Sequence, residues 1–202
     1  MRAGARDVVE EVRTAAVPDP AEALRAAVGG DEDGFRVLYR DLQPRLLRYA
    51  TALVGAEAED VTAETWLQVA RDLRRFTGDI DGFRGWVSTI CRNRALDVAR
   101  AGSRRPAVPT DLATLAEHPD PHDTAGDALD VIGTRWAMEQ ILALPPRQAE
   151  AVLLRAVVGL DAVGAAKVLG LRAGAVRVSA HRGLRRIAQN LRKDPAVGGT
   201  HA

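Results

Sequence analysis

The sequence predicts an all-α protein of two small helical domains joined by a flexible linker. Apolar residues recur at steps of three and four along several segments, which is the spacing of one buried helix face. Runs that alternate with period two, typical of strands, are few, and aromatic residues make up only 4% of the chain. Residues 101–127 hold four prolines and five acids without apolar periodicity, so they divide the 202 residues into two parts.

The first domain is predicted over residues 19–105, after a flexible N-terminal tail of residues 1–18. Asp19 can cap a helix that carries Pro20 at its first position. The glycine pair 29–30 then ends this helix. The domain is therefore expected to begin with a short helix.

Three longer helices are expected to complete the first domain. One runs from about residue 35 to 55, and Pro44 should kink or interrupt it. The next covers about 59–75, and the last covers 83–100 after a turn at 76–82. The predicted buried face of the last helix is Trp86, Val87, Ile90, Ala95 and Val98.

The second domain is predicted over residues 129–193, between a linker at 106–128 and a flexible tail at 194–202. Its helices are expected at 131–144, 146–158, 161–170 and from residue 173 onward. The prolines after residue 144 end the first of these helices.

The last two predicted helices have the spacing of a helix-turn-helix. Asp161 can cap the first helix, Ala166 lets the second helix approach closely, and Gly170 can make the turn at positive φ. A plain helical hairpin shows the same pattern. The residues that follow the turn therefore decide between the two.

The final helix carries most of the basic charge of a nearly neutral chain. The formal net charge is +1, but residues 131–202 carry +7. The predicted apolar face is Val176, Ala180, Leu184, Ile187 and Leu191. The remaining surface holds Arg177, His181, Arg182, Arg185 and Arg186. A solvated helix face normally mixes both signs, so this uncompensated face favours a polyanion such as DNA.

The composition excludes several classes of protein. Cys91 is the only cysteine, so we expect no disulfide, and we interpret it as a small buried residue. His118 and His122 stand four apart, but the prolines around them prevent an aligned helix, so no metal site is expected. We find no apolar membrane span, signal core, phosphate loop or nucleophile arrangement. We therefore expect a cytoplasmic protein that is not an enzyme, has no cofactor or small-molecule substrate, and does not insert into a membrane.

Two sets of motifs resemble the extracytoplasmic-function (ECF) sigma factors of bacterial RNA polymerase. The segments "LPPRQAEAVLLRAVVGLDAVGAAKVLG" and "AVRVSAHRGLRR" resemble sigma region 4. In the first domain, "AEDVTAETWLQVARDL" resembles the polymerase-binding helix of region 2, and "FRGWVSTICRNRALDVAR" resembles the helix that reads and opens the -10 element. The resemblance covers about residues 31–105 and 129–191, and we expect no further domain after it.

The resemblance implies a sigma factor that binds core RNA polymerase and directs promoter-specific initiation, with a sequestering anti-sigma factor as a further partner. The implied polymerase-binding residues are Glu59, Asp60, Glu64, Leu67 and Gln68. The implied -10 residues are Arg75, Phe76, Arg84, Trp86, Arg92, Asn93, Arg94 and Asp97. The implied -35 residues are Arg172, Arg177, Ser179, His181, Arg182, Arg185 and Arg186.

Several positions depart from the family pattern and leave other interpretations open. Ala63 stands where a glutamine is usual, Ala175 offers no hydroxyl cap, and Ser179 stands where an arginine is common. Trp86 is interpreted as a core residue rather than as a base-stacking one, and Phe76 is equally compatible with anchoring the loop to the core. The rival functions are a stand-alone helix-turn-helix regulator and a protein-interaction adaptor whose helix-turn-helix has lost DNA contact.

Overall fold

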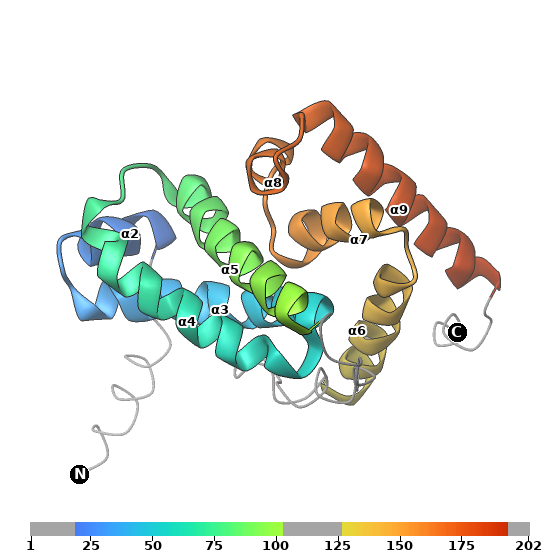
Figure 1. Cartoon of the computed structure of the whole chain (residues 1–202), viewed down its shortest axis with the longest axis horizontal. Helices are drawn as coiled ribbons and strands as arrows, with labels where there is room; N and C mark the ends of the chain where they lie inside the picture. The colour runs from blue at the N-terminus through green and yellow to red at the C-terminus, as the bar shows by residue number, and fades with distance from the viewer. Residues whose placement is uncertain (1–18, 103–126, 194–202) are drawn as a thin grey trace, which may run out of the picture.

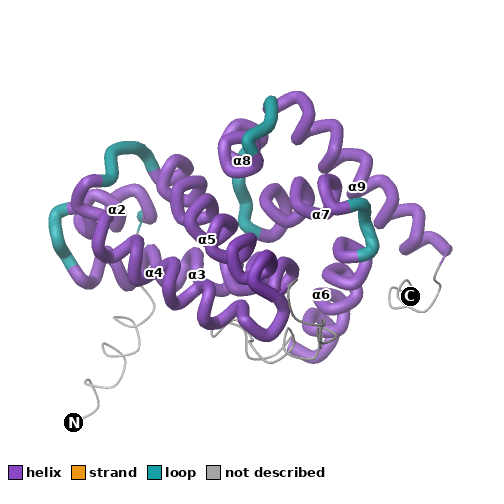
Figure 2. Tube along the Cα trace, in the orientation of Figure 1, coloured by secondary structure: helices purple, strands orange, loops and turns teal. Residues whose placement is uncertain are grey.

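The computed structural model describes residues 19–102 and 127–193, in which every regular element is a helix (Figure 1, Figure 2). The predicted tails at 1–18 and 194–202, and linker residues 106–126, lie outside the described residues. The elements are α2 (Pro20–Val28), α3 (Glu32–Val54), η1 (Gly55–Glu57), α4 (Ala58–Asp72), η2 (Leu73–Arg75), α5 (Ile80–Gly102), α6 (Asp127–Leu142), α7 (Pro146–Val152), η4 (Leu153–Val157), α8 (Ala162–Leu169) and α9 (Ala173–Lys193). The predicted all-α fold class is confirmed.

α3 is the central helix of the first domain, and α2, α4 and α5 all pack against it (Figure 1). Its residues Leu38, Leu42 and Leu46 are buried, as their helical spacing predicts. Gly34 permits the close approach of α2, because a Cβ at this position would lie 2.7 Å from the carbonyl oxygen of Ala23. Burial of each leucine stabilises the domain by roughly 1.5–3 kcal/mol.

Pro44 does not end α3, which continues to Val54. A proline inside a helix leaves the carbonyl four residues earlier without its donor and costs about 3 kcal/mol or more. Here that carbonyl belongs to Arg40, an exposed residue within reach of water. Buried leucines on both sides of Pro44 hold the helix against α2, α4 and α5.

α5 begins at Ile80 rather than at the predicted Phe83. The Asp79 carboxylate accepts a hydrogen bond from the amide of Gly82 at 2.8 Å, and its carbonyl accepts one from the amide of Phe83 at 2.9 Å. Asp79 therefore caps the helix. The second half of the predicted turn is helical for this reason.

α8 and α9 pack together as the predicted helix-turn-helix. The Asp161 carboxylate accepts a hydrogen bond from the amide of Gly164 at 2.6 Å and caps α8. Gly170 ends α8 with φ 64° and ψ 34°, the left-handed conformation that favours glycine. The amide of Leu171 then bonds to the carbonyl of Ala166 at 2.9 Å, which completes the cap.

The buried face of α9 differs from the prediction. Val176 and Ala180 are buried, but Leu184 is 47% exposed and Leu191 is 41% exposed. Successive steps of four drift around a helix of 3.6 residues per turn, so residue 184 lies about 80° from residue 176. Gly183 instead faces the core, where a Cβ would lie 2.8 Å from Cγ2 of Val152.

The two domains pack against each other in this structure. α8 contacts α5, and η4 contacts α3 (Figure 1). η4 is a π-helical turn, in which the amide of Val158 bonds to the carbonyl of Leu153 at 3.0 Å. The buried apolar residues of both domains consequently form one continuous cluster.

Candidate nucleic-acid interface

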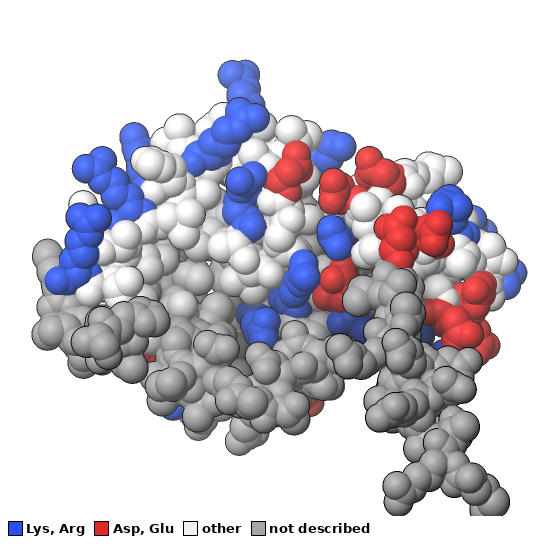
Figure 3. Space-filling view, turned by 180° about the vertical axis from the view of Figure 1, so that it is seen from behind, with Lys and Arg blue, Asp and Glu red and all other residues white. Residues whose placement is uncertain are grey.

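The candidate -35 residues of α9 form an exposed basic surface. Arg177, Arg182, Arg185 and Arg186 are exposed, and none has an ion-pair partner among the described residues. Basic side chains gather over the α9 side of the molecule, while acidic ones lie mainly over the first domain (Figure 3). Unpaired arginines so close together are stabilised when an anion binds between them.

A polar hollow lies beside this surface, between α7 and α9. It measures about 520 Å³ and is lined by Gln148, Arg182, Arg185, Arg186, Gln189 and Asn190. Each arginine guanidinium carries five N–H donors and can bind a phosphate through two parallel hydrogen bonds. The hollow therefore offers a binding position for a nucleic-acid backbone.

The other candidate -35 residues lie just before α9 and in its N-terminal half. Arg172 is exposed and immediately precedes the helix, His181 is exposed, and Ser179 is half-buried. The amides of Ala175 and Val176 both bond to the carbonyl of Arg172, without a hydroxyl cap. The positive end of the helix dipole therefore lies next to Arg172.

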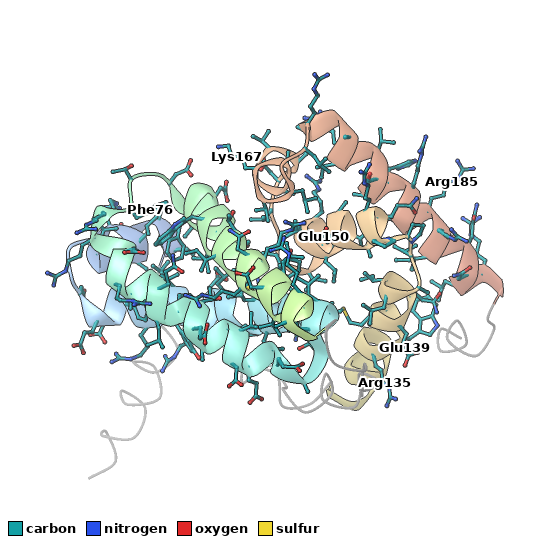
Figure 4. All side chains as sticks on the ribbon, viewed as in Figure 1. Phe76, Arg135, Glu139, Glu150, Lys167 and Arg185 are labelled. Atoms are coloured by element: carbon teal, nitrogen blue, oxygen red, sulfur yellow. The ribbon has the colours of Figure 1, made fainter. Side chains whose placement is uncertain are left out.

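Two aromatic candidate -10 residues stack on each other. The rings of Phe76 and Trp86 lie 5.2 Å apart with an interplanar angle of 27°, and Phe83 contacts both. Phe76 and Trp86 are half-buried, whereas Phe83 is buried. This cluster anchors the turn before α5 to the helix (Figure 4). Both residues thus contribute to the core as well as to the edge of the surface.

The remaining candidates on α5 fall into tethered and free groups. The Arg84 guanidinium pairs with Asp41 of α3 at 2.9 Å and is 20% exposed, so it joins two helices. Asn93 is exposed, as is Asp97, which pairs with Arg100 at 2.9 Å. Asn93 is therefore the candidate whose side chain is open to an incoming base or phosphate. Arg75, at the end of η2, is likewise exposed.

Arg92 points across the domain boundary and forms a two-point ion pair with Glu150 of α7. Its Nε lies 2.7 Å and its Nη2 3.3 Å from the two carboxylate oxygens. The side chains are 20% and 21% exposed. The hydrogen bond to Glu150 raises the pKa of Arg92, despite partial burial. Sequence reasoning identified Arg92 but not Glu150, because no local pattern marks a partner 58 residues away.

Tyr49 of α3 lies buried beside this pair. Burial raises the pKa of its hydroxyl, and the charge of Glu150 adds to that effect. The hydroxyl makes no hydrogen bond of good geometry among the described residues. Tyr49, Arg92 and Glu150 therefore bring α3, α5 and α7 together at one point.

Arg94 connects the candidate -10 helix with the candidate polymerase-binding helix. Its guanidinium forms an ion pair with Glu64 and donates to Oε1 of Gln68 at 3.0 Å. Two of the candidate residues on α4 thus hold α5 in place. Asp60 and Glu59 are exposed at the start of the same helix, where the helix dipole favours acids.

α4 also exposes an apolar stripe. Leu67 is 63% exposed, and it lines a shallow hollow with Ala70 and Arg71. Ala70 and Tyr39 line a neighbouring hollow of about 490 Å³. Sequence reasoning missed Tyr39, which lies next to the predicted buried face of α3. Its ring packs against that of Trp66, with the ring centroids 4.9 Å apart. Exposed apolar groups rimmed by charge are typical of a protein interface.

Other chemistry is absent from the described residues. They contain no group of three or more His, Cys, Asp or Glu placed to hold a metal ion, and His118 and His122 lie outside them. None of the described helices is long and apolar enough to cross a membrane. Cys91 is buried, and burial raises its thiol pKa to about 12.

Comparison with known proteins identifies the two domains. The family profile Sigma-70 region 2 matches residues 38–105, and Sigma-70, region 4 matches residues 134–187. The chain is 32% identical to the ECF RNA polymerase sigma factor BldN of Streptomyces coelicolor, over 90% of this chain and 70% of that protein. It is 34% identical to the ECF RNA polymerase sigma factor SigD of Mycobacterium tuberculosis, over 82% of this chain and 80% of that protein.

Solved structures share the fold. CnrH in complex with the cytosolic domain of CnrY aligns with a TM-score of 0.59 and 22% identity, over 87% of this chain and 99% of that chain. RpoE in complex with the anti-sigma factor NepR from Bartonella quintana aligns with a TM-score of 0.60 and 21% identity, over 81% of this chain and 99% of that chain. The sequence matches and the fold agree that this chain belongs to the ECF sigma factors, which direct RNA polymerase to promoters and are not enzymes.

Proposed function

We propose that this sigma factor divides promoter recognition among three helices. α9 holds the -35 element, α5 with the turn before it reads and opens the -10 element, and α4 binds core RNA polymerase. The observation that carries the proposal is the arginine surface of α9, which has no acidic partner among the described residues. This surface belongs to the second helix of a helix-turn-helix, which is the element that enters the major groove in such motifs.

Within α9, we assign base contacts to the first turns and backbone contacts to the later arginines. Recognition helices place their N-terminal residues on base edges, so Arg172, Arg177 and His181 are the candidates for sequence readout. Arg185 and Arg186 line the polar hollow and suit phosphates. Ser179 is half-buried and contributes a short hydroxyl contact at most.

At the -10 element, Asn93 and Arg75 are the open candidates for base or phosphate contacts. The Phe76–Trp86 stack shapes the turn that would receive an unstacked base. Unstacking one base costs a few kcal/mol, which contacts in such a pocket offset without nucleotide hydrolysis. Arg84 and Arg94 act here by positioning α5 through Asp41 and Glu64.

For polymerase binding, Leu67 and Tyr39 supply the apolar centre, and Glu59 and Asp60 supply acidic contacts at the rim. An anti-sigma factor is a further proposed partner, since the structural neighbour RpoE is bound to one. Because RNA polymerase is the partner, we place the protein in the cytoplasm. A stand-alone regulator explains α8 and α9 but leaves the exposed stripe on α4 without a role.

The test is transcription in vitro from a set of candidate promoters with purified core RNA polymerase. The double variant Arg177→Ala/Arg182→Ala should lower initiation at promoters that depend on a -35 element by about tenfold or more, because each base or phosphate contact contributes about 1–3 kcal/mol. Arg25→Ala is the matched control, since Arg25 is an exposed arginine of α2 that pairs with Glu22 of the same helix.

Equal initiation by the double variant and the control would contradict the assignment of the -35 surface to α9. Promoter-specific binding by the chain alone, with no effect on polymerase, would favour the stand-alone regulator.

A further inference from the structure

The boundary between the domains holds a charged contact that the proposed functions of α4, α5 and α9 do not use. Glu150 of α7 accepts two hydrogen bonds from the guanidinium of Arg92 of α5, and both side chains are about four-fifths buried. Figure 4 labels Glu150 where α7 approaches α5. Such a pair is costly to desolvate, and removal of one partner leaves an uncompensated charge in the contact. The pair therefore favours one arrangement of the two domains.

Further contacts surround the pair and belong to both domains. Tyr49 lies beside it from α3, and α8 packs along α5. Gly159, in the loop between η4 and α8, has φ 86° and lies against α3, because a Cβ there would be 3.3 Å from Nη1 of Arg45. The π-helical turn η4 precedes this loop and packs against α3. Single-turn π segments often mark functional positions.

This contact conflicts with promoter binding. The Arg92 guanidinium lies on the helix proposed to read the -10 element, and both of its forked donors face the Glu150 carboxylate. A carboxylate and a phosphate present the same pair of oxygens to a guanidinium. Arg92 cannot hold Glu150 and a DNA phosphate through the same two nitrogens.

We propose that Glu150 acts as an internal phosphate mimic, which latches the free protein in a closed state with Arg92 withheld from DNA. The latch is the Arg92–Glu150 ion pair, beside which Tyr49 lies buried. A promoter phosphate replaces the carboxylate when α7 and α8 move away from α5, so opening accompanies assembly on polymerase and DNA. This inference rests on the proposed -10 role of α5 for its consequence, but not for the closed state itself.

The closed state is tested without DNA, by small-angle X-ray scattering of the full chain and amide hydrogen exchange. Glu150→Ala should shift the balance between closed and open forms toward the open form by at least about tenfold, which corresponds to about 1.4 kcal/mol. The radius of gyration should rise, and exchange should become faster in α8 and along α5. Circular dichroism checks that the helices remain folded.

Glu139→Ala is the matched control, since Glu139 pairs with Arg135 within α6 on the surface. Glu150→Gln keeps the shape of the side chain and removes its charge, so it should open the protein as well. The double variant Arg92→Glu/Glu150→Arg, which swaps the two charges, should restore the compact form. An extended wild-type protein, or Glu150 variants as compact as the Glu139 control, would overturn the latch.

Activity separates the latch from the proposed function. With core polymerase at limiting concentration, Glu150→Ala should raise promoter-dependent initiation several-fold, because a larger fraction of molecules is competent to bind. Opening in scattering with no initiation by any variant would reject the proposed roles and leave the latch standing. Glu150 variants that stay as compact as the Glu139 control and initiate normally would reject the latch and leave the proposed roles standing.

Discussion

At the scale of single residues, environment decides which candidates remain available for binding. Arg92 and Asn93 are neighbours on α5, yet one is held by Glu150 and the other is open to solvent. Arg84 and Arg94 resemble DNA contacts in sequence, and both are paired with acids from other helices. The sequence identifies residue types suited to nucleic acid, whereas their partners come from helices far away in the chain.

Cys91 shows the same dependence on surroundings. Burial raises its thiol pKa to about 12, so the thiolate is scarce near pH 8. The folded protein should not react with Ellman's reagent at pH 8, and the reaction should go to completion in urea. The variant Ala56→Cys, which adds a thiol at an exposed position, serves as the positive control. Rapid labelling of Cys91 in the native state would show that its environment is open.

The raised pKa has a consequence for stability at high pH. The folded protein keeps the Cys91 proton where the unfolded chain, with a thiol pKa of about 8.5, loses it. The contribution is fully present below the unfolded pKa and is lost as pH rises toward the folded value of about 12. The free energy of unfolding of Cys91→Ala should therefore fall less with rising pH than that of the wild type between pH 9 and about 11. Denaturant titrations at each pH measure this free energy.

At the scale of elements, helix ends follow local chemistry and helix faces follow packing. Asp19, Asp79 and Asp161 each cap a helix through a carboxylate that accepts a backbone amide. The caps at Asp19 and Asp161 are predicted from sequence. The cap at Asp79 is not, because the glycines and acids around it predict a turn over residues 76–82. The face of α9 was mispredicted at Leu184 because Gly183, with no side chain, lies against α7 instead.

The turn between α8 and α9 provides a test with an internal control. Gly170 has φ 64° and open space around its Cα, so Gly170→Ala should destabilise the second domain by about 1–2 kcal/mol through backbone strain alone. Gly85 lies inside α5 with equally open space, so Gly85→Ala should stabilise by about 0.5–1 kcal/mol. Urea unfolding measures both, and effects of the same sign would contradict the role of the turn.

At the scale of the whole molecule, charge and apolar surface are separated. Basic side chains gather over α9 (Figure 3), whereas the exposed apolar residues Leu67 and Tyr39 belong to α4 and α3 of the first domain. The proposed -35 surface and the proposed polymerase-binding stripe therefore lie on different domains. Two modest contacts joined in one chain gain by effective concentration once both are made.

The apolar stripe can be tested by binding alone. Leu67→Asp should weaken association with purified core polymerase by about tenfold or more, because a central apolar contact is replaced by a charge. Leu191→Asp makes the same change at an exposed leucine near the end of α9 and should have little effect. Competition between labelled wild type and each variant measures the difference. Equal affinities would move the polymerase contact away from α4.

The sequence by itself determined the all-α class, the helix-turn-helix and the basic face of α9, because periodicity, caps and unbalanced charge are local properties of consecutive residues. It also located α4 and α5 through motifs that resemble sigma region 2. Only the tertiary structure decided that Pro44 lies inside a continuous helix, that Tyr39 joins the exposed stripe, and that Arg92 forms an ion pair with Glu150. These features depend on contacts between helices that are distant in the chain, and no local pattern of residues records such contacts.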